Sequence, residues 1–418
     1  MAKKSTSKQV KSSPTKTAKA SQVNSIKLQG WWWHRQGLDG SIGNSDAADT
    51  LARCGWARSV AGVGPYITLF ARNGASRNDV DDAVAKAKIH ELPAARNCTY
   101  VVPEIHYALA LRAGQDFSTS EMKTAMKLGV TEKEIERLCD AVLKCLKGRQ
   151  LDPAAIRTAT GDLSRSLGEE GKKKGVTTTL PIALGKLQTE GLIRRVPIDG
   201  RLDQQRYLYT AWSPGPLKGF KLSQEQVFKQ LAELYFRWIG PATLGEFQWF
   251  SGLGVKAAKA AVEGLSLCPI DSDGTLLLLE EDMEEFEKFK PDGKPDYQLL
   301  SSLDSITTLR RNVVSLLHPD DADRPLPIDR MKEAAGALSD LPCHAIFDRG
   351  RLIGLWEYDY DKAEIVTFTF VKQDKHLKAK IDEMSTYIQE QVGDARSFSL
   401  DSPKSRQGRI ADLRALSK

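Results

Sequence analysis

The sequence contains no apolar run close to the roughly 20 residues that a membrane-spanning helix requires, so we expect no association with a membrane. It also has no C-x-x-C pair, and no histidine stands near a cysteine at a spacing typical of zinc sites. Dispersed cysteines beside apolar residues are typical of buried free thiols in a reducing compartment, which predicts a cytoplasmic protein without a metal or another cofactor. These cysteines are Cys54, Cys98, Cys139, Cys145, Cys268 and Cys343.

Three common catalytic motifs are absent as well. The chain has no G-x-S-x-G elbow, no phosphate-binding Walker loop and no H-E-x-x-H metal-binding helix. Their absence excludes the usual sites of α/β-hydrolases, P-loop nucleotide hydrolases and zinc proteases. Any chemistry must therefore come from another arrangement of residues.

Acidic residues are missing from positions 1–28, which hold seven lysines. This segment is polar and has no apolar core, so it is not a secretory signal, and we expect a disordered basic tail. The whole chain has 60 basic residues. Without these seven lysines, 53 basic residues remain against 54 acidic residues. The rest of the chain is therefore almost neutral, and an interaction with nucleic acid has to be argued from where the charges lie. The tail either adds non-specific affinity for phosphate or only keeps the protein in solution.

The stretch from Asp152 to Trp212 has the periodicity of two helices followed by a hairpin. Alternating residues over 192–196 and 206–209 predict two strands. The second helix has apolar residues on one face, namely Leu180, Ala183, Leu184 and Leu187. Helix, helix and hairpin is the order of a winged helix, in which the second helix enters the major groove and the wing follows the backbone. A charged, solvated hairpin on an unrelated α+β domain is the alternative interpretation.

Basic and hydroxyl side chains lie where such a module would contact double-stranded DNA. Three lysines lead into the second helix, three threonines at its start suit phosphate oxygens, and four arginines lie on the hairpin. The candidate DNA-binding residues are Lys172, Lys173, Lys174, Thr177, Thr178, Thr179, Arg194, Arg195, Arg201 and Arg206.

The same order of elements recurs after a linker at 213–216. A helix over 223–239, a short helix opened by proline, a basic helix and a hairpin ending at 279 follow one another. An internal repeat of this kind supports the winged-helix interpretation. The turn of the second hairpin, at 271–274, is acidic, which favours packing against protein for this copy.

We therefore predict an α+β protein with tandem winged-helix modules and a C-terminal antiparallel β-containing domain. The expected units are the tail at 1–28, an N-terminal winged-helix domain at 29–130, a central winged helix at 131–214, a second winged-helix repeat at 220–290 and a C-terminal α+β domain at 296–418. Three adjacent tryptophans, Trp31 to Trp33, begin the folded part. They either stack on bases or anchor a helix between two packed elements.

RWIGPATLGEFQWFSGLG, residues 237–254, resembles the GPAT signature of the AlkZ/YcaQ winged-helix family. The resemblance covers most of residues 31–370, through RQGL at Arg35, LARCGW, YITLFAR, NCTYVVP and RGRLIGLWE. Members of this family are DNA glycosylases that open interstrand crosslinks and remove other N-alkylated purines. The resemblance implies a glycosylase-like N-terminal domain and a monomer that binds duplex DNA in the cytoplasm, associated with the nucleoid.

The family's chemistry depends on a Gln-x-Gln or Gln-x-Asp tripeptide that positions water and supports the positive charge developing on the sugar. Counting back from Tyr66 places this tripeptide at Arg58-Ser59-Val60. Val60 cannot orient water, and the guanidinium of Arg58 only donates hydrogen bonds and stays charged. The catalytic residues are therefore unknown. Glu104 and His106 are candidate replacements, and the alternative is a glutamate at a helix start beside a partly exposed histidine.

The leading hypothesis is a DNA-binding, glycosylase-like repair protein. One version is an active hydrolase of alkylated purines that uses unidentified residues, so whether the chain is an enzyme stays open. The alternative is a non-catalytic DNA-binding or transcriptional regulatory protein on the same scaffold, for which the missing tripeptide is the argument. A third function, a scaffold for protein interactions, follows from the acidic second hairpin.

Overall fold

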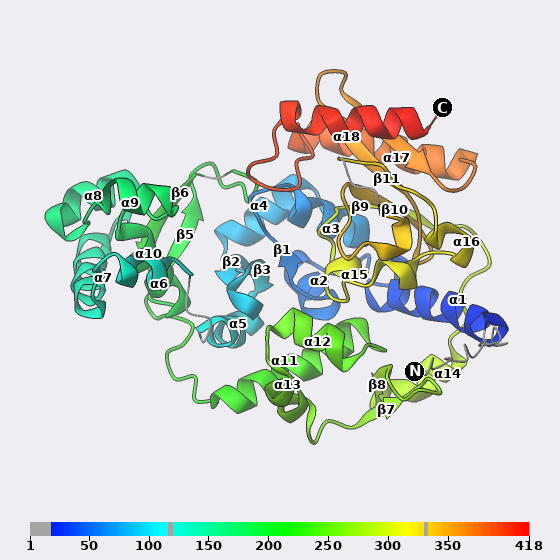
Figure 1. The fold of residues 1–418 in the computed structure, drawn as a ribbon, viewed down its shortest axis with the longest axis horizontal. Coiled ribbons are helices and arrows are strands. Elements are labelled where there is room, and N and C mark those ends of the chain that lie inside the picture. The colour runs from blue at the N-terminus through cyan, green and yellow to red at the C-terminus, as the bar shows by residue number, and fades with distance from the viewer. Residues whose placement is uncertain (1–17, 116–119, 205, 330–332, 418) are drawn as a thin grey trace, which may run out of the picture.

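The computed structural model describes residues 18–115, 120–204, 206–329 and 333–417 (Figure 1). Helices and small antiparallel sheets make up these residues, which confirms the predicted α+β class. Within the same residues, no helix is both long and apolar enough to cross a membrane. All six cysteines are described and none forms a disulfide, and four of them are buried.

The first helix, α1 (Ala18–Arg35), begins inside the predicted tail. Residues 18–28 are thus helical, while the remainder of that tail lies outside the described residues. All three tryptophans of α1 are buried. The indole N–H groups of Trp31 and Trp32 donate to the carbonyl oxygens of Gly240 and Pro241, and that of Trp33 donates to Asp296. The run therefore anchors the helix between packed elements, and its rings are not available to bases.

The N-terminal region packs short helices around a three-stranded sheet with the order β1-β3-β2. Its elements are α2 (Ala47–Cys54), β1 (Ala57–Arg58), α3 (Gly64–Asn73), α4 (Arg77–Ala85), β2 (Ile89–Pro93), η1 (Ala95–Asn97), β3 (Thr99–Pro103), η2 (Glu104–His106) and α5 (Tyr107–Gln115). The register pairs Arg58 with Tyr100 and Ala57 with Val101. Across β3, Glu91 of β2 also pairs with Val101, so β3 joins the two outer strands.

The central module contains the predicted helices and hairpin, with additional short elements. These elements are α6 (Ser120–Lys127), α7 (Glu132–Leu146), β4 (Gln150–Leu151), α8 (Pro153–Thr160), η3 (Gly161–Leu163), α9 (Gly168–Lys173), α10 (Leu180–Thr189), β5 (Ile193–Pro197) and β6 (Tyr207–Ala211). The sheet order is β4-β6-β5. Apolar residues from 125 to 193 form a core of their own, so the module is a separate packing unit. Figure 1 shows it at one end of the longest axis.

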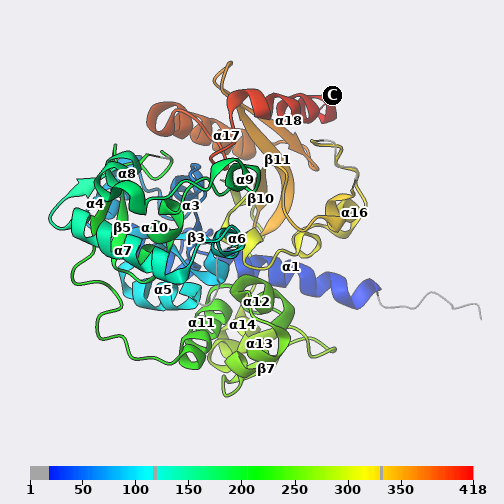
Figure 2. The same ribbon diagram turned by 60° about the vertical axis from the view of Figure 1, so that its left-hand side comes forward.

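A second unit repeats this order. It consists of α11 (Gln224–Ile239), α12 (Leu244–Ser251), α13 (Val255–Val262), β7 (Leu267–Pro269), β8 (Leu277–Leu279), η4 (Glu280–Asp282) and α14 (Met283–Lys288). Ala242, between the first two helices, forms an isolated bridge with Leu277 of β8. This bridge takes the place that β4 occupies beside β6 in the central module. Figure 2 shows the central module in front of the N-terminal helices, with the second unit below it.

The C-terminal region is built on a four-stranded sheet with the order β12-β11-β10-β9. Its elements are β9 (Tyr297–Leu300), α15 (Ser305–Thr308), η5 (Val313–Leu316), α16 (Pro319–Ala322), η6 (Ala335–Ala337), β10 (His344–Asp348), β11 (Arg351–Asp359), β12 (Glu364–Thr369), α17 (Lys375–Tyr387), η7 (Ile388–Val392) and α18 (Pro403–Leu416). Helix α18 packs on one face of this sheet, with Ile410 and Leu413 in the same core as Leu355, and α17 packs on the opposite face, with Leu377 and Met384 in the core that contains Trp356. A Cβ atom at Gly350 would stand 2.0 Å from the carbonyl oxygen of Gln29, so only glycine allows α1 to approach this closely.

One hydrophobic core joins the two ends of the chain. It contains Leu51 and Leu69 of the N-terminal helices, Leu299 and Trp356 of the C-terminal sheet, and Leu202 from the turn of the central hairpin. The units predicted at 29–130 and 296–418 therefore share a core. The turn of the central hairpin belongs to that core as well, which limits what its arginines can reach.

Candidate functional site

The position expected to hold the catalytic tripeptide lies at the end of β1. The Nη1 atom of Arg58 donates to the carbonyl oxygen of Thr99 at 3.2 Å, and its guanidinium lies 5.1 Å from the ring centroid of Tyr100. A cation resting on an aromatic ring thus occupies the place where the resemblance expects a glutamine.

C-terminal residues cover the segment that follows. Ser399 donates from its backbone N–H to the carbonyl oxygen of Val60, and Val63 donates to that of Arg396. A Cβ atom at Gly62 would stand 2.3 Å from the carbonyl oxygen of Ser397, so the two segments are in tight contact. The backbone at and after the second catalytic position is therefore bound to C-terminal residues.

A buried carboxylate stands beside the tripeptide position. Glu91 is 4 % exposed, and its Oε1 atom accepts a hydrogen bond from the fully buried hydroxyl of Ser59. The other oxygen, Oε2, has no hydrogen-bond partner and lies 3.9 Å from Nη2 of Arg195. The sequence pattern did not single out Glu91, because only the pairing of β2 with β3 and of β3 with β1 brings it to Ser59. An acid inside the apolar strand IHELP is the signal that was available.

Glu104 and His106 make contacts that stabilise the fold. Glu104 is exposed and forms an ion pair of 2.9 Å with Lys88. The Nδ1 atom of His106 accepts from the indole N–H of Trp56 at 3.2 Å. Burial lowers the pKa of His106 to about 4, so the ring is neutral at pH 7. These contacts support the structural interpretation of both side chains.

Two of the predicted wing arginines are already bound within the protein. The side chain of Arg195 is 19 % exposed and lies over the ring of Tyr207, close to Glu91. Arg201 donates to Asp203 at 2.8 Å and to the carbonyl oxygen of Val392 at 3.0 Å. A contact with DNA requires guanidinium groups that are free, and these two are not.

The backbone of the turn between β5 and β6 is also hydrogen-bonded to the rest of the protein. The backbone N–H of Leu202 donates to the hydroxyl of Tyr66 at 2.8 Å, and Arg396 donates to the carbonyl oxygen of Asp203. The hairpin turn therefore packs against α3 and the C-terminal segment. Of the four predicted arginines, Arg206 is exposed and Arg194 is partly exposed.

The segment before α10 remains open to solvent. Lys172, Lys173 and Lys174 are exposed, and the first two form only exposed ion pairs within α9. Thr177 is exposed and Thr178 is partly buried, where it forms a bridge with Ser166. The remaining predicted hydroxyl belongs to Thr179, which is fully buried. It donates to the carbonyl oxygen of Leu163, so its role is to hold the turn.

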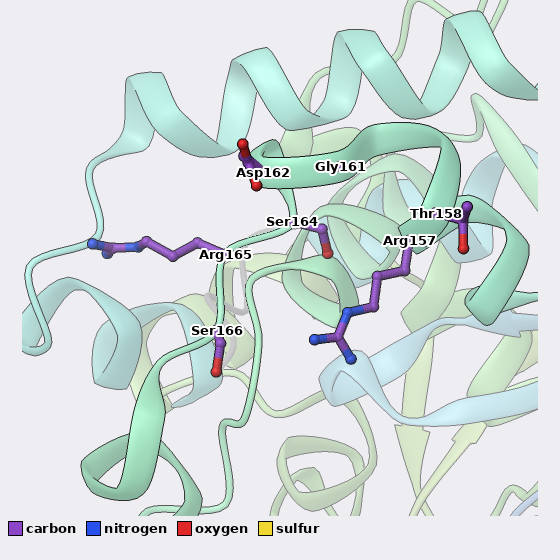
Figure 3. Close-up of a pocket in the computed structure, with 7 residues that line it drawn as sticks. All are labelled: Arg157, Thr158, Gly161, Asp162, Ser164, Arg165 and Ser166. Carbon is purple, nitrogen blue, oxygen red and sulfur yellow. The ribbon is translucent and has the colours of Figure 1, made fainter.

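A cavity of about 490 Å³ opens beside this segment (Figure 3). Its lining residues are Arg157, Thr158, Gly161, Asp162, Ser164, Arg165 and Ser166. The hydroxyl of Ser164 is buried and has no hydrogen-bond partner. Figure 3 shows Arg157 and Ser164 pointing to the same space, while Arg165 points away, where it pairs with Glu134 at 2.9 Å. A guanidinium beside an unpaired hydroxyl is suited to an anion.

The residues that carry the family resemblance form buried polar joints. Arg72, the last residue of YITLFAR, donates to both carboxylate oxygens of Asp304 at 2.8 Å and to Gln36 of RQGL at 3.0 Å. Within the GPAT signature, Glu246 forms a capping box with Thr243, the N-cap of α12, and pairs with Arg310 at 3.0 Å. Both joints connect segments far apart in the sequence, so these motifs maintain the fold.

The fold is α+β, with two repeated helix-and-hairpin units, the second of which packs against the aromatic N-terminal helix, and it presents an exposed basic segment before α10. The chain belongs to the AlkZ-like DNA glycosylase family, whose model matches residues 62–387. The matched segment begins after the tripeptide position.

A solved structure shows a similar fold. Streptomyces sahachiroi DNA glycosylase AlkZ superposes with a TM-score of 0.65 and 19 % sequence identity, over 89 % of this chain and 98 % of that chain. No curated protein matches the chain in sequence. The predicted family is thus confirmed, and the structural likeness at this identity concerns the fold.

Proposed function

We propose that this chain binds double-stranded DNA through its central module and does not release bases by the mechanism of its family. In this proposal the module acts as a winged helix, with α10 directed at the major groove. The observation that carries it is the exposed lysine run Lys172 to Lys174, which lies at the end of α9 and is joined to α10 by a short loop.

The proposed DNA contacts are made by those predicted DNA-binding residues whose side chains are exposed. The three lysines, Thr177 and Arg206 are exposed, and the cavity beside Arg157 and Ser164 adds an anion site. These groups fit phosphate oxygens, which position a protein on the duplex without reading its sequence. Arg195 and Arg201 hold the hairpin in place in this proposal.

The contacts around the tripeptide position argue against base release. A hydrolysing pair must orient water and stabilise positive charge on the sugar. Arg58 brings a permanent positive charge to that place, and Val60 has an apolar side chain and a carbonyl oxygen that is bonded to Ser399. Neither can supply what the reaction needs.

The salt dependence of duplex binding tests the first part of the proposal. Replacing Lys172, Lys173 and Lys174 together with alanine should lower the affinity and reduce the slope of log K against log salt by up to about 3, since each lost phosphate contact removes roughly 0.9. The matched control replaces three exposed lysines in or beside α17, namely Lys372, Lys375 and Lys378. If both triple variants lowered the affinity and the salt slope equally, the segment before α10 would contribute only through the net charge of the protein. A wild-type chain that binds no duplex at moderate salt would favour the protein scaffold.

A second candidate function, base release, rests on Glu91. This carboxylate has an unpartnered oxygen and lies beside Ser59, at the centre of the tripeptide position. Base release from a crosslinked or N7-alkylated duplex should be measured with the wild type, Arg58→Ala and Glu91→Gln. The proposal expects no release from any of them. Release by the wild type that disappears in Glu91→Gln would establish the hydrolase instead.

A further inference from the structure

Two large apolar side chains are exposed close together near the C-terminus. Leu400 is 85 % exposed, the highest value for a large hydrophobic side chain among the described residues, and Phe398 is 41 % exposed. Neither belongs to a hydrophobic core formed by the described residues, so burial inside the fold does not account for them. Exposed apolar side chains that stand together are typical of interaction sites, unlike scattered single ones. We call residues 397–401 the C-terminal turn.

Hydrogen bonds hold the C-terminal turn in one shape. The backbone N–H of Asp401 donates to the carbonyl oxygen of Phe398 at 2.9 Å, and that of Ser397 donates to the carboxylate of Asp401 at 3.3 Å. The same carboxylate accepts from Nη2 of Arg409 in α18 at 2.8 Å, and both of these side chains are buried. The turn is thus fixed from α18, and a backbone that is held in advance loses little freedom when its side chains bind a partner.

The C-terminal turn lies on the tripeptide position. Ser399 donates from its backbone N–H to the carbonyl oxygen of Val60 at 2.9 Å. Phe398 and Leu400 are the two neighbours of the residue that makes this bond. The two exposed apolar side chains therefore stand beside the place where the resemblance expects a base to be released.

The C-terminal turn also adjoins the proposed DNA-binding surface. Arg396, the residue before it, donates to the carbonyl oxygen of Asp203 in the turn of the central hairpin, and Figure 1 shows this hairpin reaching the segment between α17 and α18. The hairpin carries the exposed Arg206, whose carbonyl oxygen accepts from the backbone of Ile198 at 3.0 Å. On the other side, Lys404 is exposed in the first turn of α18. A duplex bound at the hairpin therefore lies next to the two apolar side chains.

We propose that Phe398 and Leu400 form an apolar wedge that enters the base stack of bound duplex DNA beside the tripeptide position, an inference that rests on the proposed DNA binding. Proteins that bend DNA insert such side chains between neighbouring base pairs. The faces of two unstacked bases are largely apolar, so covering them with a phenylalanine ring and a leucine side chain offsets part of the lost stacking. A mismatched base costs less to unstack than a paired one. The wedge therefore favours a duplex with a mismatch over a fully paired duplex.

Phe398→Ser with Leu400→Ser removes the wedge and leaves every charge in place. The affinity for duplex should fall about 10-fold, because the burial of apolar surface between bases is lost. The salt slope should not change, because no phosphate contact is removed. The matched control is Ile26→Ser with Val314→Ser, two side chains of α1 and η5 that are 62 % and 49 % exposed. It should bind like the wild type.

A fluorescent purine analogue that is quenched by stacking reports insertion directly. Placed in turn at each position of a duplex with one central mismatch, it should brighten at one step when the wild type binds. The serine variant should bind without this brightening and without preference for the mismatch. Phe398→Leu with Leu400→Phe keeps both apolar side chains and should retain the brightening and the preference. Both double variants should melt with the wild type, because the two side chains are exposed.

The wild type decides first. If the analogue never brightens while the duplex is bound, no side chain enters the stack and the inference is overturned. It is overturned as well if the serine variant brightens the analogue equally. The proposed function survives either result provided that the variant at Lys172 to Lys174 loses affinity and salt slope, and it fails if that variant binds like the wild type. If the wild type self-associates and the serine variant does not, while both bind duplex equally, the turn contacts protein and the wedge is refuted.

Discussion

Replacing Asp304 by asparagine should destabilise the protein strongly. Its carboxylate accepts hydrogen bonds from both terminal nitrogens of Arg72 and from the hydroxyl of Thr68, and all three side chains are buried. Asparagine has nearly the same shape but no charge, so Arg72 would keep a buried positive charge without a counter-ion. Breaking a buried ion pair from one side costs about 3–5 kcal/mol.

The change in melting temperature follows from the length of the chain. At about 2 cal/mol/K of unfolding entropy per residue, a cooperative transition of 418 residues should fall by roughly 4–6 °C. Differential scanning calorimetry measures this directly. Replacing both partners, Arg72→Met with Asp304→Leu, removes both charges and should recover part of the loss. The recovery is incomplete, because Asp304 also caps α15 and Gln36 loses a donor.

Two results would refute this reasoning. An Asp304→Asn protein that melts within about 1 °C of the wild type would show that the pair does not carry the predicted energy. A double variant no more stable than the single one would attribute the loss to hydrogen bonds and capping, and not to the uncompensated charge.

Two further predictions concern buried groups. His90 is fully enclosed, its ring nitrogens have no partner, and burial lowers its pKa to about 3. Between about pH 3 and 6.5, His90 is protonated in the unfolded chain but neutral in the folded chain. The free energy of unfolding therefore falls as the pH drops through this range, by up to about 2 kcal/mol at pH 5. His90→Phe should raise the melting temperature more at pH 5 than at pH 8, unlike His376→Phe on the surface, and an equal change at both pH values would contradict this. Tyr66→Phe removes the bonds to Leu202 and Asp81, which at about 1–2 kcal/mol should accelerate amide exchange in the hairpin turn roughly 5- to 30-fold. Unchanged exchange there, as expected for Tyr360→Phe, would mean that the hydroxyl does not hold the turn.

Periodicity and capping predicted the helices and hairpins of both repeated units. The apolar spacing of α10 and the capping serine before α11 each depend on residues only a few positions apart. Such elements can therefore be located from neighbouring residues in the sequence. The pattern missed β1 and β4, which have two residues each, and α9, which has six. Elements of that length carry no period, and their partners lie far away in the sequence.

The candidate site shows the same limit. The lysines before α10 are exposed, because a polar run without apolar residues has nothing to bury, and their contact with DNA stays a prediction. Whether Arg201 is free was beyond the pattern, since its partner Val392 lies at the far end of the chain. Glu91 was missed for the same reason, because strand pairing brings it to Ser59.

The sequence by itself determined the α+β class, the repeated units, the family and the departure at Arg58 to Val60, because these follow from local patterns and residue identity. Only the tertiary structure decided which cations are free and which are bound. It buried three tryptophans that a sequence could assign to bases, closed the turn of the central hairpin against α3, and bound the turn that carries Phe398 and Leu400 to Val60. Contacts of this kind join residues hundreds of positions apart, and no short-range pattern encodes them.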